Sequence, residues 1–230
     1  MEKKKMKLWK KILIAIVIVL VIFVLITARK VIIIKGLQDR IEKYSNINNY
    51  YIKFVSTQGQ ETENYVKGEK YITTLTVTSS EGKVSKLTNY CNGEKINTYI
   101  EGGEEKVAIL DSEGLPTSAG IISWVRTDNI VQLISMSITS HIKTENCNGK
   151  ECYKISNFYS NNLLYSEGKN EVYIEKETGL TIKAINGTAV DENGNEQEII
   201  SEYEYKFGVV TDDDLKEPDI SEYKIQNNNE

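Results

Sequence analysis

Histidine, proline and cysteine are scarce in this chain of 230 residues, which has one His, two Pro and three Cys. A single His excludes metal sites built from several histidines and leaves one base for any Ser or Cys nucleophile. The sequence also has no GxSxG string and no Gly-rich loop of the kind that cradles phosphate. We therefore expect neither an enzyme nor a bound cofactor.

The single histidine, His141, falls in a predicted strand over Ile138–Glu145. Alternation along a strand places its side chain on the face opposite Ile138 and Ile142, and so toward solvent. A catalytic triad would also need a positioned nucleophile and an orienting carboxylate, and the sequence identifies neither. We expect a structural role for His141.

Acidic residues are plentiful, but their pattern is ambiguous. The segment Asp212–Asp219 offers carboxylate oxygens of the kind that calcium prefers, and Thr211 or Asp212 would equally cap a short turn there. The run Asp191–Glu196 has its Gly at the fourth position, whereas a calcium loop has it at the sixth, so it predicts a hairpin turn. We predict no metal site.

One long apolar run lies near the N-terminus. The stretch Ile12–Ala28 has no charged residue, and its length is close to the ~20 residues that cross a ~30 Å hydrocarbon layer. Residues 1–11 carry six Lys and one Glu, whereas only Arg29, Lys30 and Lys35 follow the run closely. Because the larger positive cluster stays in the cytoplasm, we predict a cytoplasmic tail over 1–11, a transmembrane anchor over 12–28 and an extracellular main domain.

A cleaved signal peptide is the alternative for this run. Its apolar core would span only ~7–15 residues and end in a small-x-small site, a pattern that Thr27-Ala28 before Arg29-Lys30 fits poorly. No Cys lies in or just after the run, which disfavours a lipid-anchored lipoprotein. An uncleaved anchor is the favoured interpretation.

The rest of the chain is acidic. The net charge is −5, and residues 1–11 contribute +5, so the remainder carries −10. An acidic surface repels phosphate backbones and anionic headgroups. This charge argues against nucleic acid as a partner and against peripheral adhesion to a membrane.

Two patterns follow the anchor. Apolar residues from Val31 to Tyr44 recur at helical spacing, which predicts that the membrane helix continues and packs on the domain. From Tyr50 onward, alternation and Gly- or Asn-bearing turns predict antiparallel strands. These are Tyr50–Thr57, Glu61–Lys67, Lys70–Thr78, Lys83–Asn89, Lys95–Glu101, Lys106–Asp111, Ile138–Glu145, Glu151–Asn157, Asn170–Glu175, Thr181–Val190 and Glu196–Phe207.

An apolar block over Leu115–Ser137 breaks the alternation and predicts helices, the second of them capped by Thr127 or Asp128. Its apolar side chains, with those of a later connection, have two interpretations, ordinary core packing and contact with a ligand in a cavity, and core packing is the favoured one. The candidates are Trp124, Val125, Ile130, Leu133, Ile134, Met136, Leu163 and Leu164.

The order of elements and several strings resemble the LolA/LolB-like lipoprotein-carrier superfamily. The strings are Asn46-Ile47-Asn48-Asn49-Tyr50-Tyr51 after the helix, Asn92-Gly93-Glu94-Lys95 between two strands, and the strand, turn and return strand over Val172–Ala184. The resemblance implies an α+β fold that is mainly antiparallel β. It would be an incomplete half-barrel of about 11 strands with covering helices over 31–225. The resemblance also implies a cavity for acyl chains or an apolar segment. Apart from the resemblance, we expect the chain end over 226–230 to be a disordered tail.

Cys147 and Cys152 flank a predicted hairpin tip, where they could face each other at disulfide distance. Two free thiols or a redox pair are the alternatives, although the spacing is not CxxC. Cys91 is left over, and we expect it to be a buried apolar residue.

These observations favour a non-enzymatic module that is tethered to the cell membrane and binds a lipid, a lipoprotein acyl chain or an apolar peptide. The alternative is a regulatory or structural envelope protein that binds another membrane or envelope protein through its sheet. The apolar run separates this chain from a soluble carrier that travels between membranes.

Overall fold

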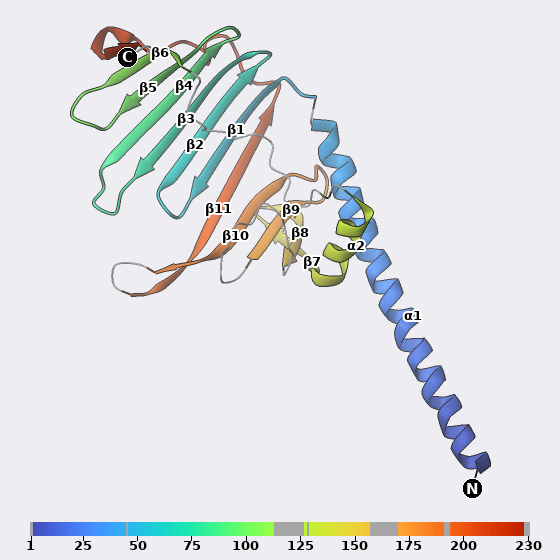
Figure 1. Cartoon of the computed structure of the whole chain (residues 1–230). Coiled ribbons are helices and arrows are strands. Elements are labelled where there is room, and N and C mark those ends of the chain that lie inside the picture. Colours follow the sequence, from blue (N-terminus) through green and yellow to red (C-terminus); the bar gives the residue numbers. More distant parts are fainter. Residues whose placement is uncertain are drawn as a thin grey trace.

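A continuous helix of 40 residues, α1 (Glu2–Ile41), leads into an open sheet of 12 strands (Figure 1). The computed structural model describes residues 2–44, 46–112, 127, 129–156, 170–190 and 194–227. Two short 3-10 turns, η1 (Glu42–Tyr44) and η2 (Ile220–Glu222), and the helix α2 (Ile130–Thr139) complete the described elements. The helix α1 therefore enters the domain without a linker, as its apolar spacing predicted.

The strands run in the order β12-β6-β5-β4-β3-β2-β1-β11-β10-β9-β8-β7. All neighbours are antiparallel except β12 and β6, which are parallel. The bounds are β1 (Asn49–Ser56), β2 (Gln60–Lys67), β3 (Lys70–Thr78), β4 (Val84–Asn92), β5 (Ile96–Glu101), β6 (Val107–Ser112), β7 (His141–Cys147), β8 (Lys150–Ser156), β9 (Asn170–Glu175), β10 (Thr181–Val190), β11 (Glu196–Phe207) and β12 (Lys224–Asn227). Each of the eleven predicted strands has a counterpart among these.

Besides shifts of one to three residues at the ends of several strands, three larger differences from the prediction occur. Ile138 belongs to α2, so β7 begins at His141. The N-cap of α2 is Asn129, whose side chain accepts a hydrogen bond from the Gln132 amide at 2.9 Å, and the prediction of Thr127 or Asp128 was wrong. The strand β12 includes Gln226 and Asn227, which the sequence placed in a frayed tail.

The main core lies where α1 and α2 pack on strands β8 to β11. Ile34 and Leu37 of α1 are fully buried. They join Leu133 and Met136 of α2 and apolar residues of the strands in one cluster. Burial of an aliphatic side chain of this size contributes roughly 1.5–3 kcal/mol, so this cluster fixes α1 on the sheet. We call the side of the sheet that α1 covers the helix face.

The opposite side, which we call the tail face, is covered by the segment that follows β11. Val210 and Leu215 of this segment pack against Tyr51, beside Tyr65 and Ile72. The Tyr99 hydroxyl donates to Glu217 in the same segment. Burial and that carboxylate raise the pKa of Tyr99 above its usual range. The hydroxyl therefore stays protonated at neutral pH and continues to donate this hydrogen bond.

The N-terminal part of α1 lies apart from the sheet (Figure 1). Its large apolar side chains from Ile12 to Ile26 are 42–65% exposed. Among the described residues, one helix is long and apolar enough to cross a membrane, and this is the helix.

Candidate functional site

Strands β2 to β6 carry an ordered pattern on the helix face, beyond the part that α1 and α2 cover. Because directly paired residues of antiparallel strands share a face, the strand register places side chains in rows across the sheet. The first row is apolar: Leu75, Leu87, Ile100 and Val107 are paired in turn from β3 to β6. All four side chains are half-buried.

A second row, directly beside the first, is polar and buried. Asn64, Thr73, Asn89 and Thr98 are paired in turn from β2 to β5. The Thr73 hydroxyl donates to Asn64 Oδ1 at 2.8 Å, and the Thr98 hydroxyl donates to Asn89 Oδ1 at 2.8 Å. These bonds offset the cost of burying amide and hydroxyl groups.

A third row, Val66, Tyr71, Cys91 and Ile96, completes the pattern. We call these three rows together the striped face. Cys91 is buried and its sulfur accepts a hydrogen bond from the Gly93 amide at 3.4 Å, so it has the structural position that the sequence predicted.

The apolar row extends toward the main core. Leu75 is paired with Thr62, which is paired with Phe54, and Phe54 is paired with Tyr203 of β11. The rings of Phe54 and Tyr203 are 5.4 Å apart, and both belong to the cluster beneath α1. A nearly continuous apolar path therefore runs from the covered core to β6.

The predicted cavity residues divide into three groups. Leu133 and Met136 are buried in the main core, whereas Ile130 and Ile134 are 61% and 42% exposed. Trp124, Val125, Leu163 and Leu164 lie outside the described residues. A ligand role for any of these residues stays a prediction.

Cys147 and Cys152 lie near the tip of the hairpin of β7 and β8, where Asn148 and Gly149 both have positive φ, as a type I′ turn requires. Their sulfurs are not bonded to each other in this structure, and both side chains are buried in a small cluster with Ile182. The register pairs Cys152 with Glu145 and Cys147 with Lys150, so the two cysteines are diagonal neighbours. Burial raises the pKa of the Cys152 thiol to about 11, which keeps it protonated and poorly nucleophilic at neutral pH. Their disulfide stays a prediction.

His141 is exposed at the start of β7, opposite Ser156, as the sequence predicted. The Asp-rich segment makes local contacts. Asp214 accepts hydrogen bonds from both the amide and the hydroxyl of Thr211, at 2.8 and 2.6 Å, and these bonds lower its pKa. The side chain that accepts the backbone hydrogen bond in this turn is therefore that of Asp214, and not that of Thr211 or Asp212 as the sequence predicted.

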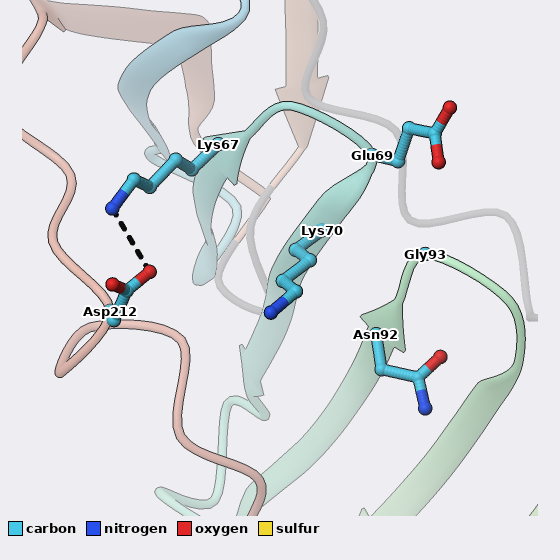
Figure 2. A pocket seen from close by; sticks show the side chains of 6 residues that line it. All are labelled: Lys67, Glu69, Lys70, Asn92, Gly93 and Asp212. Atoms are coloured by element: carbon cyan, nitrogen blue, oxygen red, sulfur yellow. Dashed lines mark hydrogen bonds and ion pairs between the residues drawn. The ribbon is translucent and has the colours of Figure 1, made fainter.

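A small polar pocket of about 310 Å³ lies at one end of β2, β3 and β4, and Figure 2 shows its lining residues. Lys67 points toward Asp212 and pairs with it at 2.9 Å, which lowers the pKa of Asp212. Lys70, Asn92 and Gly93 line the pocket beside this pair. The pair joins the segment after β11 to the turn between β2 and β3, and it adds little to stability because water screens such exposed charges.

A second hollow of about 430 Å³ lies where the tip of the β7–β8 hairpin approaches β1 and β11. Its lining includes Lys53, Lys150 and Glu202. Sequence reasoning identified neither hollow. The first needs Asp212, which lies far along the chain from β2 to β4, and the second brings the β7–β8 hairpin to β1 and β11. Charged side chains line both hollows, so neither is a purely apolar cavity.

No protein-family model matches the sequence, and a comparison with curated proteins gives no match. Solved structures that are similar include MucB, at 15% identity and a TM-score of 0.34 over 82% of this chain. The Pseudomonas aeruginosa MucA/MucB complex has 11% identity and a TM-score of 0.32 over 80% of this chain. This chain covers 63% and 61% of those two chains.

A DUF1329 family protein from Desulfovibrio piger is also similar, at 11% identity and a TM-score of 0.31, over 80% of this chain and 97% of that one. Scores of this size do not assign the chain to a family. The resemblance to the LolA/LolB-like superfamily therefore rests on the strings described above.

Proposed function

We propose that this protein is a non-enzymatic binding module that is tethered to the cell membrane and holds a lipid, an acyl chain or an apolar peptide on the striped face. The domain lies outside the cytoplasm, and residues 1–11 lie inside. The apolar row Leu75, Leu87, Ile100 and Val107 is the observation that carries the proposal.

The tether is supported by the exposure of the apolar run. Side chains that are 42–65% exposed from Ile12 to Ile26 would cost free energy in water, whereas hydrocarbon accommodates them. The same helix continues to Leu37, whose full burial joins it to the core. The protein therefore binds its ligand in place beside the membrane.

The dimensions of the apolar row suit an extended apolar ligand. Neighbouring strands lie ~4.8 Å apart, so the row from β3 to β6 is about 14 Å long. An acyl chain could lie along it, as could a peptide of about four extended residues at ~3.3 Å per residue. The hydrogen-bonded polar row beside it would confine the ligand to the apolar path.

Truncation of this row is expected to weaken binding. The double variant Leu75→Ser and Leu87→Ser should bind a fluorescent fatty acid roughly tenfold more weakly, since each lost contact removes about 0.7 kcal/mol of apolar burial. The measurement uses the full chain transferred from detergent into an amphipathic polymer. Mass spectrometry of extracted lipids identifies any ligand that is retained through purification.

The matched control is the double variant Val55→Ser and Val84→Ser. Val84 lies on the same strand as Leu87 but on the tail face, and both valines are exposed. The control should bind like the unaltered chain. If both double variants bind equally well, or the unaltered chain binds no fatty acid and retains no lipid, the striped face is not the binding site for such a ligand.

A second candidate function is the binding of another envelope protein by strand addition. Within the described part of the sheet, β7 is an edge strand with a strand neighbour on one side only. Edge strands present unpaired backbone groups to which an extended segment of a partner can add.

A photo-crosslinking residue in place of exposed Thr144 tests this candidate in cells. The strand-addition function requires a discrete protein adduct at Thr144 and none at exposed Ser80, which lies in the turn between β3 and β4. Equal labelling at both positions would contradict it.

A further inference from the structure

The outward side of α2 is apolar. Ile130, Val131, Ile134 and Ile138 are 61%, 71%, 42% and 46% exposed. They recur at three and four residues and so form one stripe along the helix, opposite buried Leu133 and Met136. No residue of α2 is charged. An uncharged helix with an exposed apolar stripe is unusual on a domain with a net charge of about −10.

Two hydrogen bonds fix the height of α2 along α1. The Gln38 side chain donates to the Thr127 hydroxyl at 2.8 Å, just before α2 begins. Lys30 Nζ donates to the Ser140 carbonyl at 2.5 Å, just after α2 ends. Lys30 and Gln38 are eight residues apart, or about 12 Å along a helix. The helix α2 therefore runs beside α1 with its C-terminal end toward the apolar run (Figure 1).

This height places the end of α2 close to the hydrocarbon boundary. Lys30 comes two residues after Ala28, the last residue of the apolar run, which is about 3 Å along α1. Ile138 lies in the last turn of α2, near Ser140. Ile32, which is 72% exposed, lies about 6 Å beyond Ala28 on α1. Lys30, Ile138 and Ile32 therefore lie within the ~5–10 Å depth of an interfacial layer.

We propose that the C-terminal half of α2 is a second membrane contact, in which Ile134 and Ile138, with Ile32 of α1, enter the interfacial layer of the outer leaflet. This inference rests on the anchoring proposed above. The bilayer is the favoured occupant because α1 holds these side chains at a fixed height beside the anchor. Exposed Arg29 adds a positive charge at the same level, which attracts anionic headgroups.

The contact would orient the domain. A single helix leaves rotation about its axis free, whereas a second point of contact beside it restricts that rotation. The striped face would then be presented at one height and in one direction relative to the membrane surface.

Fluorophore labels on single introduced cysteines test the proposal in the full chain, reconstituted into phosphatidylcholine vesicles. The positions are Ile138→Cys, Val84→Cys as an exposed apolar control on β4, and Val21→Cys in the anchor. The native cysteines are buried, and an unaltered chain gives their background labelling. Nitroxide-bearing lipids then quench labels at the headgroup or at the acyl depth.

We expect headgroup nitroxides to quench the label at position 138 at least twofold more strongly than the label at position 84. Equal quenching at both positions, with strong acyl-depth quenching at position 21, would overturn the α2 contact and leave the anchor intact. An unquenched label at position 21 would overturn the anchor and this inference together. Crosslinking between copies at position 138 without lipid quenching would assign the stripe to a second copy of the chain and overturn the proposal.

Discussion

Replacement of Leu37 by alanine is expected to lower the free energy of unfolding of the domain by about 3 kcal/mol. Leu37 is fully buried between α1 and the sheet, in the cluster that also holds Ile34, Ile155 and Val172. Removal of buried leucine methyl groups loses their transfer free energy and leaves a cavity, which together cost about 2–5 kcal/mol. The lost contacts are those that fix α1 on the sheet. We therefore expect α1 to separate from the sheet early in unfolding.

Urea unfolding of the detergent-solubilised chain, followed by near-UV circular dichroism of the many tyrosines, measures this change. The matched control is Ile32→Ala on the same helix, where the side chain is 72% exposed and the expected change is within about 0.5 kcal/mol. Equal destabilisation by both variants would mean that Leu37 does not anchor α1 in the core.

Replacement of Gly179 by alanine is expected to lower the free energy of unfolding by about 2–5 kcal/mol, because this turn packs against α1 at Leu37. Gly179 lies in the turn between β9 and β10 with φ of +77°, a conformation that costs an L-residue roughly 1–2 kcal/mol. An added Cβ would also lie 2.6 Å from the Leu37 carbonyl oxygen and 3.2 Å from the Ile41 nitrogen. Both are backbone atoms of α1, so the helix itself would have to move, at a further cost of about 1–3 kcal/mol.

The control for Gly179 is Gly68→Ala. Gly68 also has positive φ, +64°, but no atom lies within 4 Å of an added Cβ, so only the conformational cost remains. For a domain of this size each kcal/mol lowers the Tm by about 2–4 °C, so Gly179→Ala should lower it by roughly 4–20 °C and Gly68→Ala by roughly 2–8 °C. If the two variants have the same Tm, an added Cβ at position 179 does not clash with the backbone of α1.

The strands were predictable because their signals are local. Alternation and turn residues give the bounds of β3, β9, β10 and β11 as they occur in the structure. The start of β7 was misplaced because Ile138 ends a short apolar run, and such a run is compatible with a helix or a strand. The strand β12 was missed because its parallel pairing with β6 depends on a contact across more than a hundred residues of chain.

The candidate site was predicted less well, since its residues meet only through the strand register. Leu75 and Ile100 look like ordinary half-buried strand residues until the pairing of β3, β4 and β5 places them in one row. A one-residue shift of any strand would move its members to the tail face. The sequence instead predicted ligand contacts in the apolar block around α2. Leu133 is buried there and Ile134 is exposed, a difference that depends on which side of α2 packs against α1.

The unbroken course of α1 gives the molecule a mechanical property. A helix of 40 residues is about 60 Å long, and no proline or glycine pair interrupts it as a hinge. A tilt of about 10° at the exposed end would displace the other end by about 10 Å if α1 moved alone. Because Ile34 and Leu37 fix α1 to the sheet, the domain has to turn with the helix as one rigid body. The direction of the striped face is thus set by the angle of a helix whose far end lies outside the domain.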